Sequence, residues 1–226
     1  MAPPRGYFAS VKEICTAHDI LFVADEVLSG MGRTGDWLSI TREGVVPDIL
    51  TLGKGLSGGY APLSALVTTD QIVNTLATKS GSFSYNQTYS HTPLSAAAGV
   101  ATIDYLNRHD LVKRSASMGA YLLERLQTLK DLDIVGDVRG IGLLAGIEYV
   151  SDRASKKPHD SRLRIADRIR EAAFENGLIL WSTTRFLESG DGDLSVLGPP
   201  FVISHEQVDD LVDRLRRAIQ KVSDSV

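Results

Sequence analysis

Two short, mainly apolar segments constrain the fold of this chain more than any other feature of its sequence. Residues 20–24 read ILFVA and residues 49–52 read ILTL. Strands that are apolar on both faces are typical of parallel sheets covered by helices on both sides. The two segments are separated by about the length of one strand–helix–strand unit, with a short helix expected over residues 36–42. The sequence therefore predicts an α/β fold built on a parallel sheet.

Periodicity predicts the remaining elements. Thr92 and Pro93 are typical of an N-cap and a first helical residue, and Ser204 and Gln207 have the spacing of a capping box. Further helices are expected over residues 7–18, 93–107, 111–129, 161–176 and after residue 204, and further strands over 63–67, 133–138, 143–150 and 177–181, the last followed by a loop rich in Gly, Asp and Ser. A boundary near residue 107 would divide a sheet domain (1–107) from a smaller α/β domain (108–226).

Charge and composition exclude several classes of protein. A net charge of -4 and a pI near 5.7 provide no basic surface, so we expect no nucleic-acid partner. No stretch approaches the roughly 18 apolar residues of a membrane span, and a cytoplasmic protein is expected. Cys15 is the only cysteine, which excludes a disulfide within the chain and is compatible with a reducing compartment. Its place beside Ile14 in a predicted helix indicates an inert core thiol.

Asp25 and Lys54 stand at the carboxyl ends of the two apolar strands. Ligands of open parallel sheets bind outside the carboxyl ends of the strands, so both side chains are expected to face one ligand. An acid and an amine in this arrangement suit pyridoxal 5′-phosphate. The lysine forms a Schiff base with this cofactor, and the acid pairs with its pyridinium nitrogen. The released lysine would then transfer a proton to and from the substrate.

Glycines surround Lys54 at positions 53, 55, 58 and 59. Because glycine lacks a side chain, backbone at these positions can approach a bulky planar ligand closely. A turn with a purely structural role seldom needs so many glycines, and their number favours the cofactor interpretation over a solvated surface lysine.

Three other kinds of site match parts of the same region. Gly30-x-Gly32-x-x-Gly35 has the dinucleotide-binding pattern, but the next strand ends in Gly53 and Lys54 where that site needs an acid. A magnesium-binding acid in the VADE segment would require a GxxxxGK[ST] phosphate loop, which the sequence lacks. The five histidines are scattered without metal-ligand spacing. None of the three sites is therefore expected.

Three longer segments carry a family resemblance: ADEVLSGMGRTGDW (24–37), GVVPDILTLGKGLSGGYAPLSA (44–65) and QTYSHTPLSAAAG (87–99). Together they strongly resemble the class III aminotransferases, which include ornithine, acetylornithine, 4-aminobutyrate and other omega-amino acid transaminases. The similarity continues through VGDVRGIGLLAGIE and GPPFVIS and covers essentially the whole chain. It implies a fold-type I PLP-transferase, with part of the large mixed-sheet domain and the small C-terminal α/β domain.

The resemblance also implies roles for individual residues. Asp25 matches the partner of the pyridine nitrogen, Val27 the apolar residue against the ring face, and Lys54 the Schiff-base lysine. Thr88 in QTYS is similar to the threonine that binds the cofactor phosphate of the neighbouring subunit, which implies a homodimer with shared active sites. Arg139 in VRG matches the family as well, and we interpret it as structural.

Several positions depart from the family pattern. Leu28 stands where many members have a glutamine that contacts the cofactor, and Ser-His-Thr-Pro at 90–93 replaces the commoner Ser-Gly-His-Pro. Arg185 is the nearest candidate for binding a substrate carboxylate. Family members are also about twice as long, and their amino-terminal half supplies a phosphate-binding turn and a ring-stacking aromatic. We therefore expect a fragment, a truncated product, or a chain completed by another polypeptide.

The function expected from these features is transamination between an amine or amino acid and a keto acid. The same acid and lysine would also serve an aminomutase or a decarboxylase of this fold. A third alternative is a non-catalytic remnant or an assembly subunit, because the expected phosphate-binding turn is not found in the sequence.

Overall fold

The computed structural model describes residues 3–79, 81 and 87–226. The chain divides into two compact units, Met1–Lys113 and Arg114–Val226. The division falls in the first turn of helix α4 (Leu111–Gln127), slightly after the boundary predicted from the sequence. In the described residues, no helix combines the length and apolar character needed to cross a membrane.

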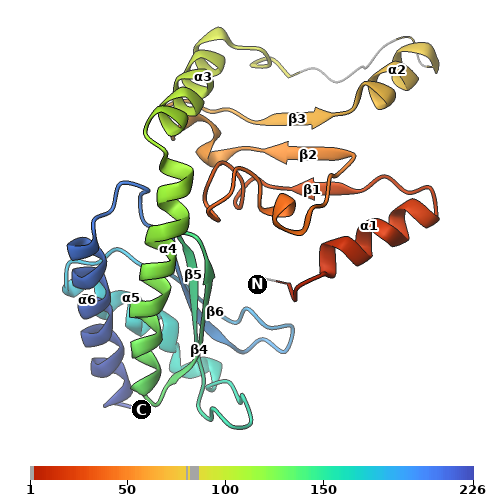
Figure 1. The fold of residues 1–226 in the computed structure, drawn as a ribbon. Helices are drawn as coiled ribbons and strands as arrows, with labels where there is room; N and C mark the ends of the chain where they lie inside the picture. Colours follow the sequence, from red (N-terminus) through yellow and green to blue (C-terminus); the bar gives the residue numbers. More distant parts are fainter. Residues whose placement is uncertain (1–2, 80, 82–86) are drawn as a thin grey trace. The chain divides into compact units, whose positions relative to one another are not determined.

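The first unit is built on a three-stranded sheet in the order β1-β2-β3 (Figure 1). Strand β1 runs parallel to β2, whereas β3 runs antiparallel to β2, so the sheet is mixed. Its elements are α1 (Tyr7–Ala17), β1 (Val23–Asp25), η1 (Ser39–Glu43), β2 (Ile49–Leu52), η2 (Lys54–Ser57), β3 (Ala65–Thr68), α2 (Asp70–Lys79) and α3 (Pro93–Arg108).

One face of this sheet is packed and the other is open within the described chain. Ala24 and Leu50 pack with Ile40 and Val45 into a small buried core. On the opposite face, the side chains of Val23 in β1 and Leu66 in β3 are 51% and 63% exposed. The prediction of strands covered on both faces is therefore wrong for the described residues, because the apolar character of these strands exceeds what this chain itself buries.

The helices of the first unit differ from prediction in three places. Helix α1 has no fully buried residue, and Cys15 on it is only partly buried. The prediction that Cys15 is a core thiol is therefore wrong. The helix expected over 36–42 is a 3-10 turn that begins at Ser39. Helix α2 was not predicted, although Ile72, Val73 and Leu76 have helical spacing, and it buries no residue within the described chain.

The second unit contains a four-stranded antiparallel sheet in the order β4-β5-β7-β6. Helices α4, α5 and α6 contribute to a large core with this sheet, in which Leu122, Ile147, Ile169 and Leu215 are almost completely buried. Burial of each such side chain contributes about 1.5–3 kcal/mol. The elements are α4 (Leu111–Gln127), η3 (Thr128–Asp131), β4 (Val135–Ile141), β5 (Leu144–Tyr149), η4 (Ser161–Leu163), α5 (Ile165–Glu175), β6 (Trp181–Thr184), β7 (Asp193–Leu197) and α6 (His205–Ser223).

Strand β7 occupies the segment that the sequence predicted to be loop. Asp193, Ser195 and Leu197 are buried and alternate with partly exposed residues. Tyr149 donates a hydrogen bond to Ser195 Oγ over 2.9 Å, and Asp193 Oδ1 accepts from the backbone amide of Ala166 at 2.9 Å. Two inward positions are thus polar, with Ser195 hydrogen-bonded and Asp193 hydrogen-bonded through Oδ1 alone, and their polarity conceals the strand from an apolar pattern.

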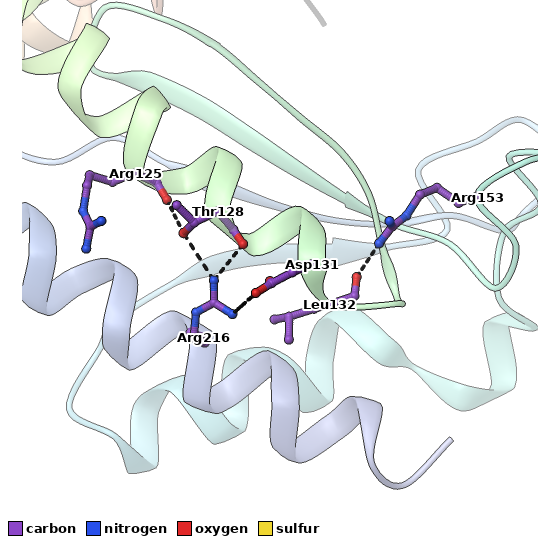
Figure 2. A network of polar contacts seen from close by, with 6 residues as sticks. All are labelled: Arg125, Thr128, Asp131, Leu132, Arg153 and Arg216. Atoms are coloured by element: carbon purple, nitrogen blue, oxygen red, sulfur yellow. Dashed lines mark hydrogen bonds and ion pairs between the residues drawn. The ribbon is translucent and has the colours of Figure 1, made fainter.

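Polar contacts link the middle of α6 to the 3-10 turn η3 that follows α4 (Figure 2). Arg216 of α6 donates from Nη1 to both carboxylate oxygens of Asp131, at 2.9 and 2.8 Å, and from Nη2 to the carbonyl oxygen of Thr128 at 2.7 Å.

At the start of α6, Ser204 and Gln207 form the predicted capping box. The predicted helix boundary is therefore confirmed.

Candidate active site

The site begins with the parallel pairing of β1 and β2, which brings both carboxyl ends to one edge of the sheet. Asp25 lies in register with Thr51, and Lys54 follows Thr51 along the chain. The opposite ends of the strands are joined by Asp48, whose Oδ2 accepts from the backbone amide of Phe22 at 2.7 Å and from Lys12 at 2.7 Å. The hydrogen bond from Lys12, and then that from Phe22, lowers the pKa of the Asp48 carboxyl.

The Asp25 carboxylate is exposed but held through one oxygen. Its Oδ1 accepts from the backbone amide of Val27 at 2.9 Å and from the hydroxyl of Thr51 at 3.4 Å. Among the described residues, Oδ2 has no hydrogen-bond partner. The side chain can therefore use that second oxygen for a ligand.

Lys54 begins the short helix η2 with a φ of 43°, in the left-handed region. A non-glycine residue in this conformation costs on the order of 1–2 kcal/mol. The conformation is maintained by the next residues, because Leu56 and Ser57 are buried and the Ser57 hydroxyl donates to the carbonyl of Ala61. The backbone is thus fixed, while the amine is exposed and has no ion pair with the described residues.

Val27 connects the two strand ends. An ideal Cβ on Gly53 would lie 3.4 Å from Val27 Cγ1, so the valine side chain rests against the backbone that precedes Lys54. Gly30 has a stricter requirement, since a Cβ there would lie 2.7 Å from the carbonyl oxygen of Glu26. Glycine at position 30 therefore allows the turn after β1 to close tightly on Glu26, whose carbonyl accepts from the Gly30 amide at 3.0 Å.

Glu26 is a structural contributor that the sequence reasoning did not identify. It is only 3% exposed, and its Oε1 accepts from the backbone amide of Ile40 at 2.6 Å while its Oε2 accepts from Ser29. This carboxylate ties the end of β1 to the start of η1. The alternation of Asp25 outward and Glu26 inward along the strand could have indicated its burial.

The other residues singled out in the sequence lie in different settings. Thr88 is exposed in the turn before α3, and no hydrogen bond among the described residues joins it to Asp25 or Lys54. Leu28 is 54% exposed. In the second unit, Arg139 forms ion pairs with Asp137 and Glu148, consistent with the structural role expected of it.

Arg185 has the least defined role of these residues. It is exposed, follows β6 directly, and has a φ of 59°. No salt bridge joins it to a described carboxylate. Its assignment as a group that binds a substrate carboxylate therefore stays a prediction.

The donor set around the strand ends suits a flat heterocyclic aldehyde. An accessible amine can bond covalently to an aldehyde carbon, and a carboxylate with one free oxygen can pair with a protonated ring nitrogen. Val27, packed against Gly53, offers an apolar contact for the ring. In the part of the chain that the structure describes, no group of three His, Cys, Asp or Glu side chains could hold a metal ion.

Comparisons with known proteins agree with this chemistry. The sequence model of the aminotransferase class-III family matches residues 1–219. A diaminobutyrate–2-oxoglutarate transaminase of Halomonas elongata is 35% identical over 99% of this chain and 47% of its own length. The chain spans about half the length of the curated relatives it matches.

Solved structures give the same result. A transaminase from the marine bacterium Virgibacillus superposes with a TM-score of 0.93 at 40% identity, over 99% of this chain and 50% of that one. An amine transaminase from an uncultivated Pseudomonas species, crystallised in its PLP-bound form, has a TM-score of 0.89 at 33% identity, over 97% and 49% of the two chains.

Proposed function

Since the chain belongs to the class-III aminotransferase family, we propose that it supplies the lysine and the carboxylate of a pyridoxal 5′-phosphate site for transamination. Its fold class, fold-type I of the PLP-transferases, is the one predicted from the sequence and is confirmed by the solved transaminases. The observation that carries the proposal is the parallel pairing of β1 and β2, which brings Asp25 and the segment leading to Lys54 to one sheet edge.

Each proposed role follows from the chemistry of the side chain. Pyridoxal phosphate, when bound, supplies a ring that accepts the electron pair of a broken substrate bond. Lys54 Nζ would bond to the aldehyde carbon of the cofactor and, once released, would take and return a proton at the substrate Cα. Asp25 Oδ2 would accept a hydrogen bond from the protonated ring nitrogen, and Val27 would offer an apolar contact to a ring face.

The proposed substrates are an amine or amino acid as donor and a keto acid as acceptor. The name of the Halomonas relative pairs an amino acid with 2-oxoglutarate, which supports this substrate class. We also propose a homodimer in which Thr88 contacts the cofactor phosphate of the neighbouring subunit. Its exposure, in a turn directly before α3, is compatible with such a contact.

Covalent labelling tests the proposal directly. The chain is incubated with pyridoxal phosphate, reduced with borohydride, digested, and analysed by mass spectrometry for the modified lysine. We expect modification at Lys54 and its loss in Lys54→Ala, with Lys113→Ala as control because Lys113 is an exposed lysine outside the site. Equal labelling of many lysines, unchanged in Lys54→Ala, would contradict the proposal.

Product analysis separates transamination from the alternative reactions. A panel of amines with pyruvate or 2-oxoglutarate would yield an amino acid from the keto acid in a transaminase, but carbon dioxide in a decarboxylase or an isomer of the donor in an aminomutase. The non-catalytic alternative predicts no specific labelling of Lys54 and no product.

A further inference from the structure

Thr51 is the only polar residue of β2, whose sequence is ILTL. The strand register places it beside Asp25 on one side and beside Leu66 on the other. A residue paired in register shares a sheet face with its neighbours, so the hydroxyl lies between a carboxylate and an apolar side chain. Among the described residues, Asp25 is the one hydrogen-bond partner of this hydroxyl.

Thr51 contacts the end of β1 through both its backbone and its side chain. Its carbonyl oxygen accepts from the backbone amide of Glu26 at 3.0 Å, which extends the parallel ladder past Asp25. Its hydroxyl donates to Asp25 Oδ1 at 3.4 Å. Because β-branched side chains have a restricted χ1, the strand backbone also sets the direction of this hydroxyl.

A second donor on Oδ1 matters because Asp25 is exposed and its side chain has several staggered χ1 rotamers to choose from. The backbone amide of Val27 donates to the same oxygen, but Val27 is only two residues away and moves with Asp25. The Thr51 hydroxyl approaches from the neighbouring strand. Two donors from different directions define the carboxylate plane and leave Oδ2 available.

We propose that Thr51 is a positioning residue of the cofactor site, which holds the Asp25 carboxylate so that Oδ2 faces the ring nitrogen. The inference rests on the proposed function for the identity of the ligand, but the hydroxyl–carboxylate contact is a property of this chain alone. Thr51 itself touches neither cofactor nor substrate in this scheme.

The first test needs no cofactor. The χ1 rotamer of Asp25 is measured by NMR side-chain couplings in the wild type, Thr51→Val and Thr51→Ser. We expect one dominant rotamer in the wild type and in the serine variant, which keeps the hydroxyl, and rotamer averaging in the valine variant. Thr68→Val is the matched control, since Thr68 lies in the same sheet and its hydroxyl donates to the carbonyl of Asp48. An unaveraged rotamer in Thr51→Val would overturn the proposal.

The second test is a double-mutant cycle on pyridoxal phosphate affinity, measured by absorbance titration. Loss of one weak hydrogen bond predicts roughly 2- to 10-fold weaker binding in Thr51→Val and near-wild-type binding in Thr51→Ser. In an Asp25→Ala background the valine substitution should cause no further loss, because the group it positions is absent. Equal weakening in both backgrounds would refute a role through Asp25.

The two tests distinguish the positioning role from the proposed function. If Asp25→Ala leaves pyridoxal phosphate affinity unchanged, the proposed cofactor site is wrong, and the positioning role at that site is wrong with it. The rotamer measurement then still decides whether Thr51 orders Asp25. If Asp25→Ala weakens binding but Thr51→Val changes neither rotamer nor affinity, the proposed function stands and the positioning role is refuted.

Discussion

Gly119 lies in the middle of α4, where replacement by alanine would ordinarily stabilise a helix by about 1 kcal/mol. The tertiary structure reverses that expectation. An ideal Cβ at Gly119 would lie 2.1 Å from the carbonyl carbon of Gly142 and 2.2 Å from its oxygen. Gly142 has a φ of 55° in the turn between β4 and β5, so the methyl group would collide with the backbone of a tight hairpin.

The size of the effect follows from what can move. Leu143, the next residue of the turn, is completely buried, and Ile141 and Leu144 on either side are paired in the sheet. The turn therefore cannot retreat without disturbing the core, and the cost lies near the upper end of the roughly 1–3 kcal/mol of overpacking. After the gain in helix propensity is subtracted, Gly119→Ala should lower the free energy of unfolding by about 2 kcal/mol, which corresponds to a fall in Tm of roughly 8 °C.

The assay is thermal unfolding by circular dichroism, combined with amide hydrogen exchange of α4 to report this unit specifically. Ser117→Ala is the control on the same helix, because Ser117 is exposed and its replacement changes only propensity and a local hydrogen bond. Gly146→Ala is the second control, since a Cβ there would meet only Ser195 O at an ordinary 3.8 Å. A Gly119→Ala protein as stable as the wild type would refute the reasoning.

Four further predictions concern other contacts. Burial lowers the pKa of His159 below the ordinary 6.5, although Asp193 opposes the shift. Below about pH 6.5 the unfolded chain therefore binds more protons than the folded one, and the free energy of unfolding should fall as the pH decreases. Urea unfolding at several pH values should show a weaker dependence of that free energy on pH in His159→Gln. Glu26→Ala leaves the Ile40 amide without its acceptor and should cost about 2 kcal/mol by the same unfolding assay. Arg216→Lys loses the forked contact with Asp131 and Thr128 and should cost about 0.5–1 kcal/mol, measured against Arg217→Lys. Ser204→Ala removes the capping box of α6 and should cost about 1 kcal/mol, with faster amide exchange in its first turn.

Patterns in the sequence located the elements that carry the candidate site. The second apolar strand was predicted with the bounds found in the structure, Ile49–Leu52, and Lys54 begins η2 just beyond it. Asp25 is the last residue of the first strand, β1. Other strands were displaced. The run predicted at 177–181 ends where β6 begins, at Trp181, and the loop after it contains β7.

The omissions have a common physical cause. Burial of Ser195 and Asp193 depends on partners distant in sequence, Tyr149 and the amide of Ala166, and no local pattern contains those partners. Glu26 is similar, because its acceptor role becomes visible only when η1 folds back onto β1. Polar residues in the core are stabilised by specific contacts, whereas apolar periodicity reports only on residues that are buried without them.

By itself, the sequence determined several local features: that residues 49–52 form a strand, where α6 is capped, and that an acid and a lysine stand at the ends of two apolar segments. Only the tertiary structure decided that β1 and β2 pair with Asp25 opposite Thr51, that Lys54 adopts a left-handed backbone, and that one carboxylate oxygen is held while the other is free. The reason is that helix capping and side-chain periodicity depend on residues a few positions apart. Register and hydrogen bonding across strands depend instead on which distant segments come into contact.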